Sequence, residues 1–168
     1  RISGTFSDDW WEGGGIDLWY SDPILANITI SGNMSSQGGG IGGWESSPTI
    51  IDAVITNNTA CNGGGIYLEN ADGAQLIRSL VANNNVQSQN GCGTNGGGLY
   101  ITGYTCDCNS LFIINSTISD NVAPGYGDGI YIRDSMPVII NSIIWDNNCN
   151  NSNCNISVFD SGDSIYET

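Results

Sequence analysis

A glycine-rich motif recurs along the chain and constrains its fold more than any other feature of the sequence. The motif is a glycine-rich triplet followed by Ile or Leu, and its last glycine lies at positions 15, 40, 65, 98 and 129. The spacing is 25, 25, 33 and 31 residues, so two of the repeats carry longer loops. A repeat of this length indicates an array of similar structural units stacked on one another.

A second motif alternates with the first: an apolar residue followed three positions later by asparagine. The five asparagines of this motif are Asn33, Asn58, Asn84, Asn121 and Asn147. Short apolar runs precede it at 24–25, 50–51, 76–77, 112–114 and 138–140. Short β-type runs without helical periodicity favour strands.

Together the two motifs predict an all-β protein with the architecture of a β-solenoid. Equivalent strands of successive coils would pair about 4.8 Å apart, so that identical positions form columns. Isoleucine columns would fill the interior, and glycine would allow corners with positive φ. A buried asparagine needs a hydrogen-bond partner, and the asparagine one coil away supplies it. We therefore expect the five motif asparagines to form an internal ladder.

The same motifs resemble the repeats of polymorphic outer-membrane proteins and related bacterial right-handed parallel β-helix proteins. This chain has Gly-Gly-Gly-Ile where that family has Gly-Gly-Ala-Ile, and Ile where the family has Phe before x-x-Asn. The resemblance covers nearly the whole chain. It implies a right-handed parallel β-helix, which the repeats here set at about five to six coils. It also implies surface display, adhesion or a passenger stalk, and no catalytic residues.

The chain is expected to form a single β-helix domain, residues 1–168, that begins in the middle of a coil, because Ile2-Ser3-Gly4-Thr5 aligns with Ile30-Ser31-Gly32-Asn33. Residues 156–159 and 164–166 are expected to form further strands. An uncapped solenoid exposes strand edges that pair readily with another chain. We expect either continuation of a longer β-helix or end-to-end stacking of copies into a filament.

Composition narrows the function classes. The net charge is −14, from 17 acidic and 3 basic residues, and the chain has no His. This argues against a nucleic-acid partner, which requires a basic face, and no apolar run is long enough to insert in a membrane. The absence of His excludes Ser-His-Asp and Cys-His catalysis. An acidic chain with an even number of cysteines fits an extracellular or cell-surface location.

The cysteines are predicted to form disulfides, with connectivity left open. They are Cys61, Cys92, Cys106, Cys108, Cys149 and Cys154. Cys149 and Cys154 are the most local candidate pair. A soft metal on the Cys106-x-Cys108 pair is the alternative. No cofactor is expected apart from calcium, for which Asp8, Asp9, Glu12 and Asp107 could supply oxygen ligands.

Two kinds of surface site are candidates. Tyr67, Tyr100 and Tyr131 follow three glycine corners and should stack in three successive coils, and Trp19 and Trp44 should stack two positions further on. Exposed aromatic rings on a flat face could bind glycans or a host surface, whereas stacking for stability is the alternative. Asn150 and Asn155 lie in accessible glycosylation sequons.

The sequence therefore predicts a non-enzymatic surface or structural protein. The alternative is a carbohydrate-binding or polysaccharide-cleaving β-helix. Cleavage of an acidic polysaccharide requires basic residues, and the only candidates are Arg1, Arg78 and Arg133. Arg78 shares a predicted column with Asp52, so a structural ion pair between them is the competing interpretation.

Overall fold

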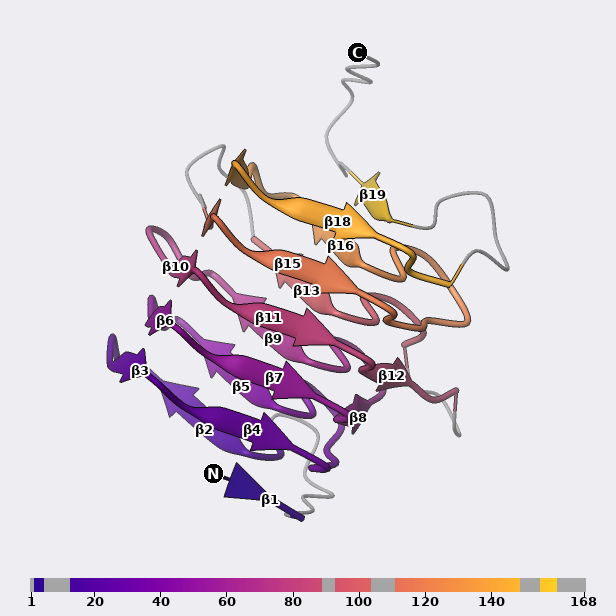
Figure 1. Ribbon diagram of the computed structural model, residues 1–168, viewed down its shortest axis with the longest axis horizontal. Helices are drawn as coiled ribbons and strands as arrows, with labels where there is room; N and C mark the ends of the chain where they lie inside the picture. Colours follow the sequence, from indigo (N-terminus) through magenta and orange to yellow (C-terminus); the bar gives the residue numbers. More distant parts are fainter. Residues whose placement is uncertain (1, 5–12, 89–92, 104–110, 149–154, 160–168) are drawn as a thin grey trace.

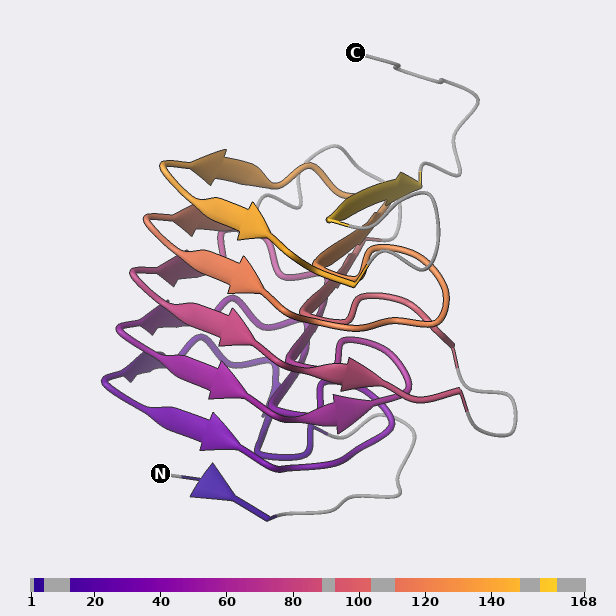
Figure 2. The ribbon, with the colours of Figure 1, turned by 45° about the vertical axis from the view of Figure 1, so that its right-hand side comes forward.

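The described residues form parallel strands stacked in sheets, an arrangement consistent with a β-solenoid (Figure 1). The computed structural model describes residues 2–4, 13–88, 93–103, 111–148 and 155–159. Within these ranges the structure is all-β, with no helix. Successive strands of one type lie above one another, so the N-terminal strands and the C-terminal strands occupy opposite ends of the stack (Figures 1 and 2).

Three long sheets and one short sheet contain the strands. Sheet 1 consists of β2 (Ile16–Trp19), β5 (Ile41–Trp44), β9 (Ile66–Glu69), β13 (Leu99–Thr102), β16 (Ile130–Arg133) and β19 (Ile156–Phe159). Sheet 2 consists of β3 (Ile24–Ala26), β6 (Thr49–Ile51), β10 (Gln75–Ile77), β14 (Phe112–Ile114) and β17 (Val138–Ile140). Sheet 3 consists of β1 (Ile2–Ser3), β4 (Thr29–Ser31), β7 (Val54–Thr56), β11 (Leu80–Ala82), β15 (Thr117–Ser119) and β18 (Ile143–Trp145). The short sheet pairs β8 (Thr59–Ala60) with β12 (Asn85–Val86).

The register of the pairing follows the sequence repeat. Ile41 pairs with Ile66 in sheet 1 and Ile50 with Leu76 in sheet 2, and both pairs are parallel. The longer loops of the later repeats leave this register intact, since Leu99 still pairs with Ile130. Pairing in register places equivalent side chains in columns, as the repeat predicts.

The columns of aliphatic side chains build the core. In sheet 3 the central residues of four successive strands are completely buried: Ile30, Ile55, Val81 and Ile118. Sheets 1 and 2 contribute equivalent columns, which include Ile66, Leu99 and Ile113. Each strand is only two to four residues long, so it gains most of its stability from its neighbours in the stack.

Left-handed backbone conformations mark the corners between the strands. Gly38, Gly63, Gly96 and Gly127 have φ between 62° and 70°, as predicted for the glycine corner. The other corners use mostly non-glycine residues with φ between 45° and 57°, and ten of these thirteen residues are Asn or Asp, whereas Gly4 and Gly32 follow β1 and β4. Asn and Asp tolerate this conformation better than other side chains. The high asparagine content therefore has two structural causes, the corners and the ladder.

The five motif asparagines form a buried ladder. Their side chains are at most 2% exposed, and the Nδ2 of each donates a hydrogen bond of 3.0 Å to the Oδ1 of the next. The same oxygens also accept backbone N–H groups, for example that of Asn58 on Asn84 at 3.0 Å. Asn147 continues the ladder to Asn155, at 3.0 Å.

A second ladder, of serines, lies at the corner after sheet 2. The Oγ atoms of Ser79, Ser116 and Ser142 each accept a backbone N–H from the preceding coil at 3.1 Å. Each hydroxyl also donates to the carbonyl two residues before it, as Ser79 does to Ile77 at 2.8 Å. These serines were not singled out in the sequence, because serine is also common in exposed turns.

Candidate functional site

The predicted tyrosine column lies on the outer side of sheet 1. The ring centroids of Tyr67 and Tyr100 are 5.0 Å apart and those of Tyr100 and Tyr131 are 4.9 Å apart. The prediction that these rings are exposed is wrong, because their exposed fractions are 7%, 8% and 8%. Stacking at the spacing of neighbouring strands covers the faces of the rings. The tyrosines therefore stabilise the stack and offer little surface to a ligand.

Charged side chains flank the tyrosine column. The hydroxyl of Tyr67 donates to Oε2 of the buried Glu69 at 2.7 Å. A hydrogen bond with Tyr100 raises the pKa of Arg133, whose guanidinium also lies 5.9 Å from the ring centroid of Phe159. Burial raises the pKa of the Tyr100 and Tyr131 hydroxyls, so both stay neutral at physiological pH. Arg133 is thus engaged by aromatic groups.

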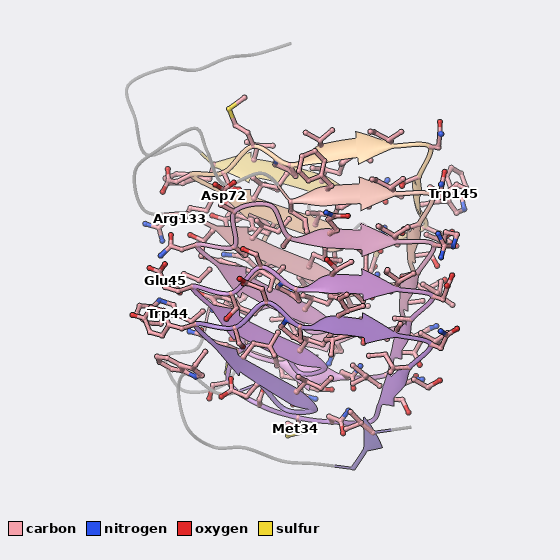
Figure 3. The ribbon with its side chains drawn as sticks, turned by 90° about the vertical axis from the view of Figure 1, so that its left-hand side faces the viewer. Met34, Trp44, Glu45, Asp72, Arg133 and Trp145 are labelled. Atoms are coloured by element: carbon pink, nitrogen blue, oxygen red, sulfur yellow. The ribbon has the colours of Figure 1, made fainter. Side chains whose placement is uncertain are left out.

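An exposed aromatic surface lies where the first two strands of sheet 1 end. The ring centroid of Trp44 is 4.9 Å from those of Trp19 and Tyr20, and the Tyr20 contact is edge-on. Trp19 is 46% and Tyr20 is 70% exposed, so this cluster, here called the aromatic edge, is accessible. Glu45, next to Trp44, is exposed and accepts a hydrogen bond from Asn70 at 3.2 Å (Figure 3). Tyr20 was not among the predicted residues, because it lies at a corner outside the strand register.

Arg78 and Asp52 form the structural ion pair considered as the competing interpretation. Nε and Nη2 of Arg78 donate to the two carboxylate oxygens of Asp52 at 2.9 and 2.8 Å. The hydrogen bond lowers the pKa of Asp52 and raises that of Arg78. The pair borders a shallow open depression lined also by Leu80, Asn115 and Thr117. A guanidinium held in a bidentate pair is poorly placed to serve as a catalytic base.

Several predicted residues lie outside the described ranges. These are Asn150, the calcium candidates Asp8, Asp9, Glu12 and Asp107, and the cysteines Cys92, Cys106, Cys108, Cys149 and Cys154. Cys61 is described and is not a free thiol. The disulfide pairing stays a prediction. No group of three metal-ligating His, Cys, Asp or Glu residues occurs among the described residues.

Asn155, a predicted glycosylation candidate, is half-buried at the end of the ladder. Its Oδ1 accepts Nδ2 of Asn147 at 3.0 Å. N-glycosylation would modify Nδ2 of Asn155, whereas the ladder uses its Oδ1, so glycosylation at this position stays a prediction.

The C-terminal end of the stack exposes residues of the core columns. Ile130 and Ile132 in β16 are 0% and 3% exposed, whereas their partners in β19, Ile156 and Val158, are 39% and 68% exposed. Ile139 in β17 is 37% exposed, while its partner Ile113 is completely buried. Among the described strands, β17, β18 and β19 are the last in their sheets.

No family model, curated protein or solved structure matches the chain. The site must therefore be interpreted from its own geometry. Within the described ranges, no helix is long and apolar enough to cross a membrane.

An apolar stripe on the outer face of sheet 2 was not among the predicted sites. Ile51, Ile77, Ile114 and Ile140 pair in successive strands, next to the buried residues Ile50, Leu76, Ile113 and the end residue Ile139. Figure 3 faces the side of the molecule on which β3, β6 and β10 lie. The signal was present in the sequence as doublets of apolar residues. In a strand, two consecutive apolar residues point to opposite faces, so one of each doublet must point outward.

Proposed function

We propose that this chain is a non-enzymatic structural protein of the extracellular space or cell surface, whose β-helix lengthens by end-to-end association. The proposed architecture is a right-handed parallel β-helix of about five to six coils. The right hand is the rule for connections between parallel strands of one sheet, and sheets of five and six strands support the coil number. An adhesin or a passenger stalk would use the same rigid rod.

The exposure of core-column residues at the C-terminal end carries this proposal. Val158 is 68% exposed at a position where the strand below it buries Ile132. Burying apolar surface gains about 25 cal/mol for each Å², so a strand added above β19 would be stabilised. The added strand belongs to another copy of the chain or to the continuation of a longer β-helix.

Matching of register favours β2 of a second copy as the added strand. If β2 of a second copy pairs with β19, Ile16 lies on Ile156, Leu18 on Val158 and Trp19 on Phe159. Both apolar core columns then continue without interruption, and an aromatic pair forms at the edge. Backbone N–H and C=O groups of the two edge strands would also become paired.

The test is sedimentation velocity over a concentration series of the purified chain. We expect elongated oligomers whose size increases with concentration, and we expect Val158→Asp to abolish these elongated species. Tyr126→Asp, at an exposed position away from the end strands, is the control and should leave association unchanged. A wild-type chain that sediments as a monomer at all concentrations would contradict end-to-end stacking.

Binding of glycans or a host surface by the aromatic edge is the second candidate function. Exposed Trp and Tyr rings beside a carboxylate suit the apolar faces of sugar rings and the hydroxyls around them. A glycan array should show binding that Trp44→Ala removes. Trp145→Ala, on the opposite edge (Figure 3), is the matched control. An array without signals would remove this candidate and leave the structural proposal untouched.

A further inference from the structure

The outer face of sheet 2 carries a continuous apolar stripe. Its central stripe consists of Ile51, Ile77, Ile114 and Ile140, which pair in register in four successive strands. A second column on the same face contains Ile24, Thr49, Gln75, Phe112 and Val138, so two polar side chains interrupt it. Ile24 is 73%, Ile140 is 43% and Val138 is 38% exposed. The outer isoleucines Ile51, Ile77 and Ile114 are half-buried.

This face also lacks charge. The five strands of sheet 2 contain no Asp, Glu, Lys or Arg. On the corner that follows these strands, the charged residues are Asp52 and Arg78, which neutralise each other at 2.8 Å. The remaining corner positions are Asn27, Asn115 and Asn141. On the other flank, Asp22 and Asp72 lie in the segments that precede β3 and β10, outside the strands themselves. The chain as a whole carries a net charge of −14, so most other approaches of two copies are opposed by repulsion.

We propose that the apolar face of sheet 2 binds the same face of a second copy, so that two rods associate side by side. Two observations favour a second copy over another partner. The face is uncharged, so two strongly acidic chains can approach there without like-charge contact. Its side chains repeat at the strand spacing of about 4.8 Å, and only a surface with the same period interdigitates along its whole length. An isologous contact of this kind closes after two copies.

The lateral contact differs from the end-to-end contact in residues and in outcome. End-to-end contact uses β19 and β2, whereas the lateral contact uses the outer residues of β6, β10, β14 and β17. A variant blocked at the end, Val158→Asp, should therefore form dimers and nothing longer. High salt should strengthen the dimer, because it screens the repulsion between the two acidic chains.

Sedimentation equilibrium on the Val158→Asp chain tests the proposal. We expect a monomer–dimer equilibrium whose dissociation constant rises about tenfold or more with Ile77→Thr and Ile114→Thr together. The matched control is the double variant Val54→Thr, Leu80→Thr on the outer face of sheet 3. This variant should change the dissociation constant less than twofold. Ile77→Val with Ile114→Val keeps the face apolar and should retain the dimer, and circular dichroism verifies that all variants fold.

Two results would overturn the lateral proposal. One is a Val158→Asp chain that stays monomeric in high salt at the highest concentration reached, which would assign the face to a different partner. The other is an equal rise of the dissociation constant in the sheet 2 double variant, Ile77→Thr with Ile114→Thr, and in the sheet 3 control. Either result leaves end-to-end association standing, because that contact is measured on the chain without Val158→Asp.

Discussion

The side-chain amide of each asparagine in the middle of the ladder donates two hydrogen bonds and accepts two. Asn84 donates through Nδ2 to Oδ1 of Asn121 at 3.0 Å and to the carbonyl of Ile55 at 2.9 Å. Its Oδ1 accepts both the backbone N–H and Nδ2 of Asn58 at 3.0 Å. No buried side-chain nitrogen or oxygen of the described residues lacks a partner. Such a network is stable because it is complete, and loss of one member affects the coils on both sides.

Asn84→Ala should therefore destabilise the fold by on the order of 3 kcal/mol, because buried groups of Asn58 and Asn121 lose their partner. Chemical denaturation measures the change. The neighbouring Asn83 is exposed and has a φ of 55°. Asn83→Gly, which fits this conformation, is the control and should stay close to wild type. Equal losses in the two variants would mean that the ladder contributes no more than a corner residue does.

Asp128 is a buried carboxylate in the glycine corner before β16, between Gly127 and Gly129. It is 1% exposed, its Oδ1 accepts the backbone N–H of Ala123 at 2.8 Å, and burial raises its pKa. A raised pKa in the folded state means that the charged form is disfavoured there, so the contribution of Asp128 to stability falls as pH rises from about 3.8 through the folded pKa.

Asp128→Asn keeps an oxygen acceptor for Ala123 and removes the charge. We expect a higher Tm at pH 7, with a gain that shrinks as the pH falls and disappears when Asp128 is protonated in both folded and unfolded chains. Thermal unfolding of both chains between pH 3 and pH 7 measures this difference in Tm. A gain of the same size at all pH values would show that the buried charge is not its cause.

At the scale of the strand and corner, the left-handed residues determine how each coil closes. Asn57 has a φ of 57°, follows β7 and is exposed, so its role is conformational. Asn57→Val should cost about 1–2 kcal/mol, because a β-branched residue is strained at positive φ. Asn57→Gly should be tolerated. Denaturant midpoints compare the two, and a neutral Val variant would contradict the conformational explanation.

The glycine before each of the first five sheet 1 strands is required for a different reason, close approach of the coils. A Cβ on Gly65 would lie 2.7 Å from the carbonyl oxygen of Gly98 and 2.9 Å from Nδ2 of Asn84. Gly65→Ala should destabilise by about 2 kcal/mol or more through this overlap. Gly73 has a φ of 84° and open space around it, so Gly73→Asn is the control. A folded, fully stable Gly65→Ala chain would disprove the steric requirement.

The strands and their register could be predicted because the repeat encodes them twice, in the glycine motif and in the x-x-Asn motif. The strand at 156–159 could be predicted from its apolar residues even without a glycine triplet before it. Side-chain exposure could not be predicted equally well. Tyr67, Tyr100 and Tyr131 point outward in a strand pattern, yet stacking between neighbouring strands covers them. A linear pattern gives the direction of a side chain but does not give what lies above and below it.

The serine ladder and the apolar face of sheet 2 show the same limit. Ser79 and Ser116 follow corners and resemble exposed turn residues, but each accepts a backbone N–H from the preceding coil. The prediction that isoleucine columns fill the interior did not distinguish the outer isoleucines from their inner neighbours, although the two-residue period of a strand allows only one of each pair to point inward.

At the scale of the whole molecule, equivalent positions are continuous from one end of the stack to the other. Each sheet consists of strands of the same type in parallel register, so an added coil repeats contacts that already exist in the molecule. The proposed end-to-end growth would therefore need no new kind of interface. It would occur at the end where Ile156 and Val158 are exposed.

Electron microscopy of the purified chain at high concentration tests the central claim most directly. We expect unbranched filaments of constant width, with a repeat of about 4.8 Å along the axis from the stacked strands, and we expect Val158→Asp to abolish them. Isolated particles of the wild-type chain at every concentration and salt level would contradict the claim.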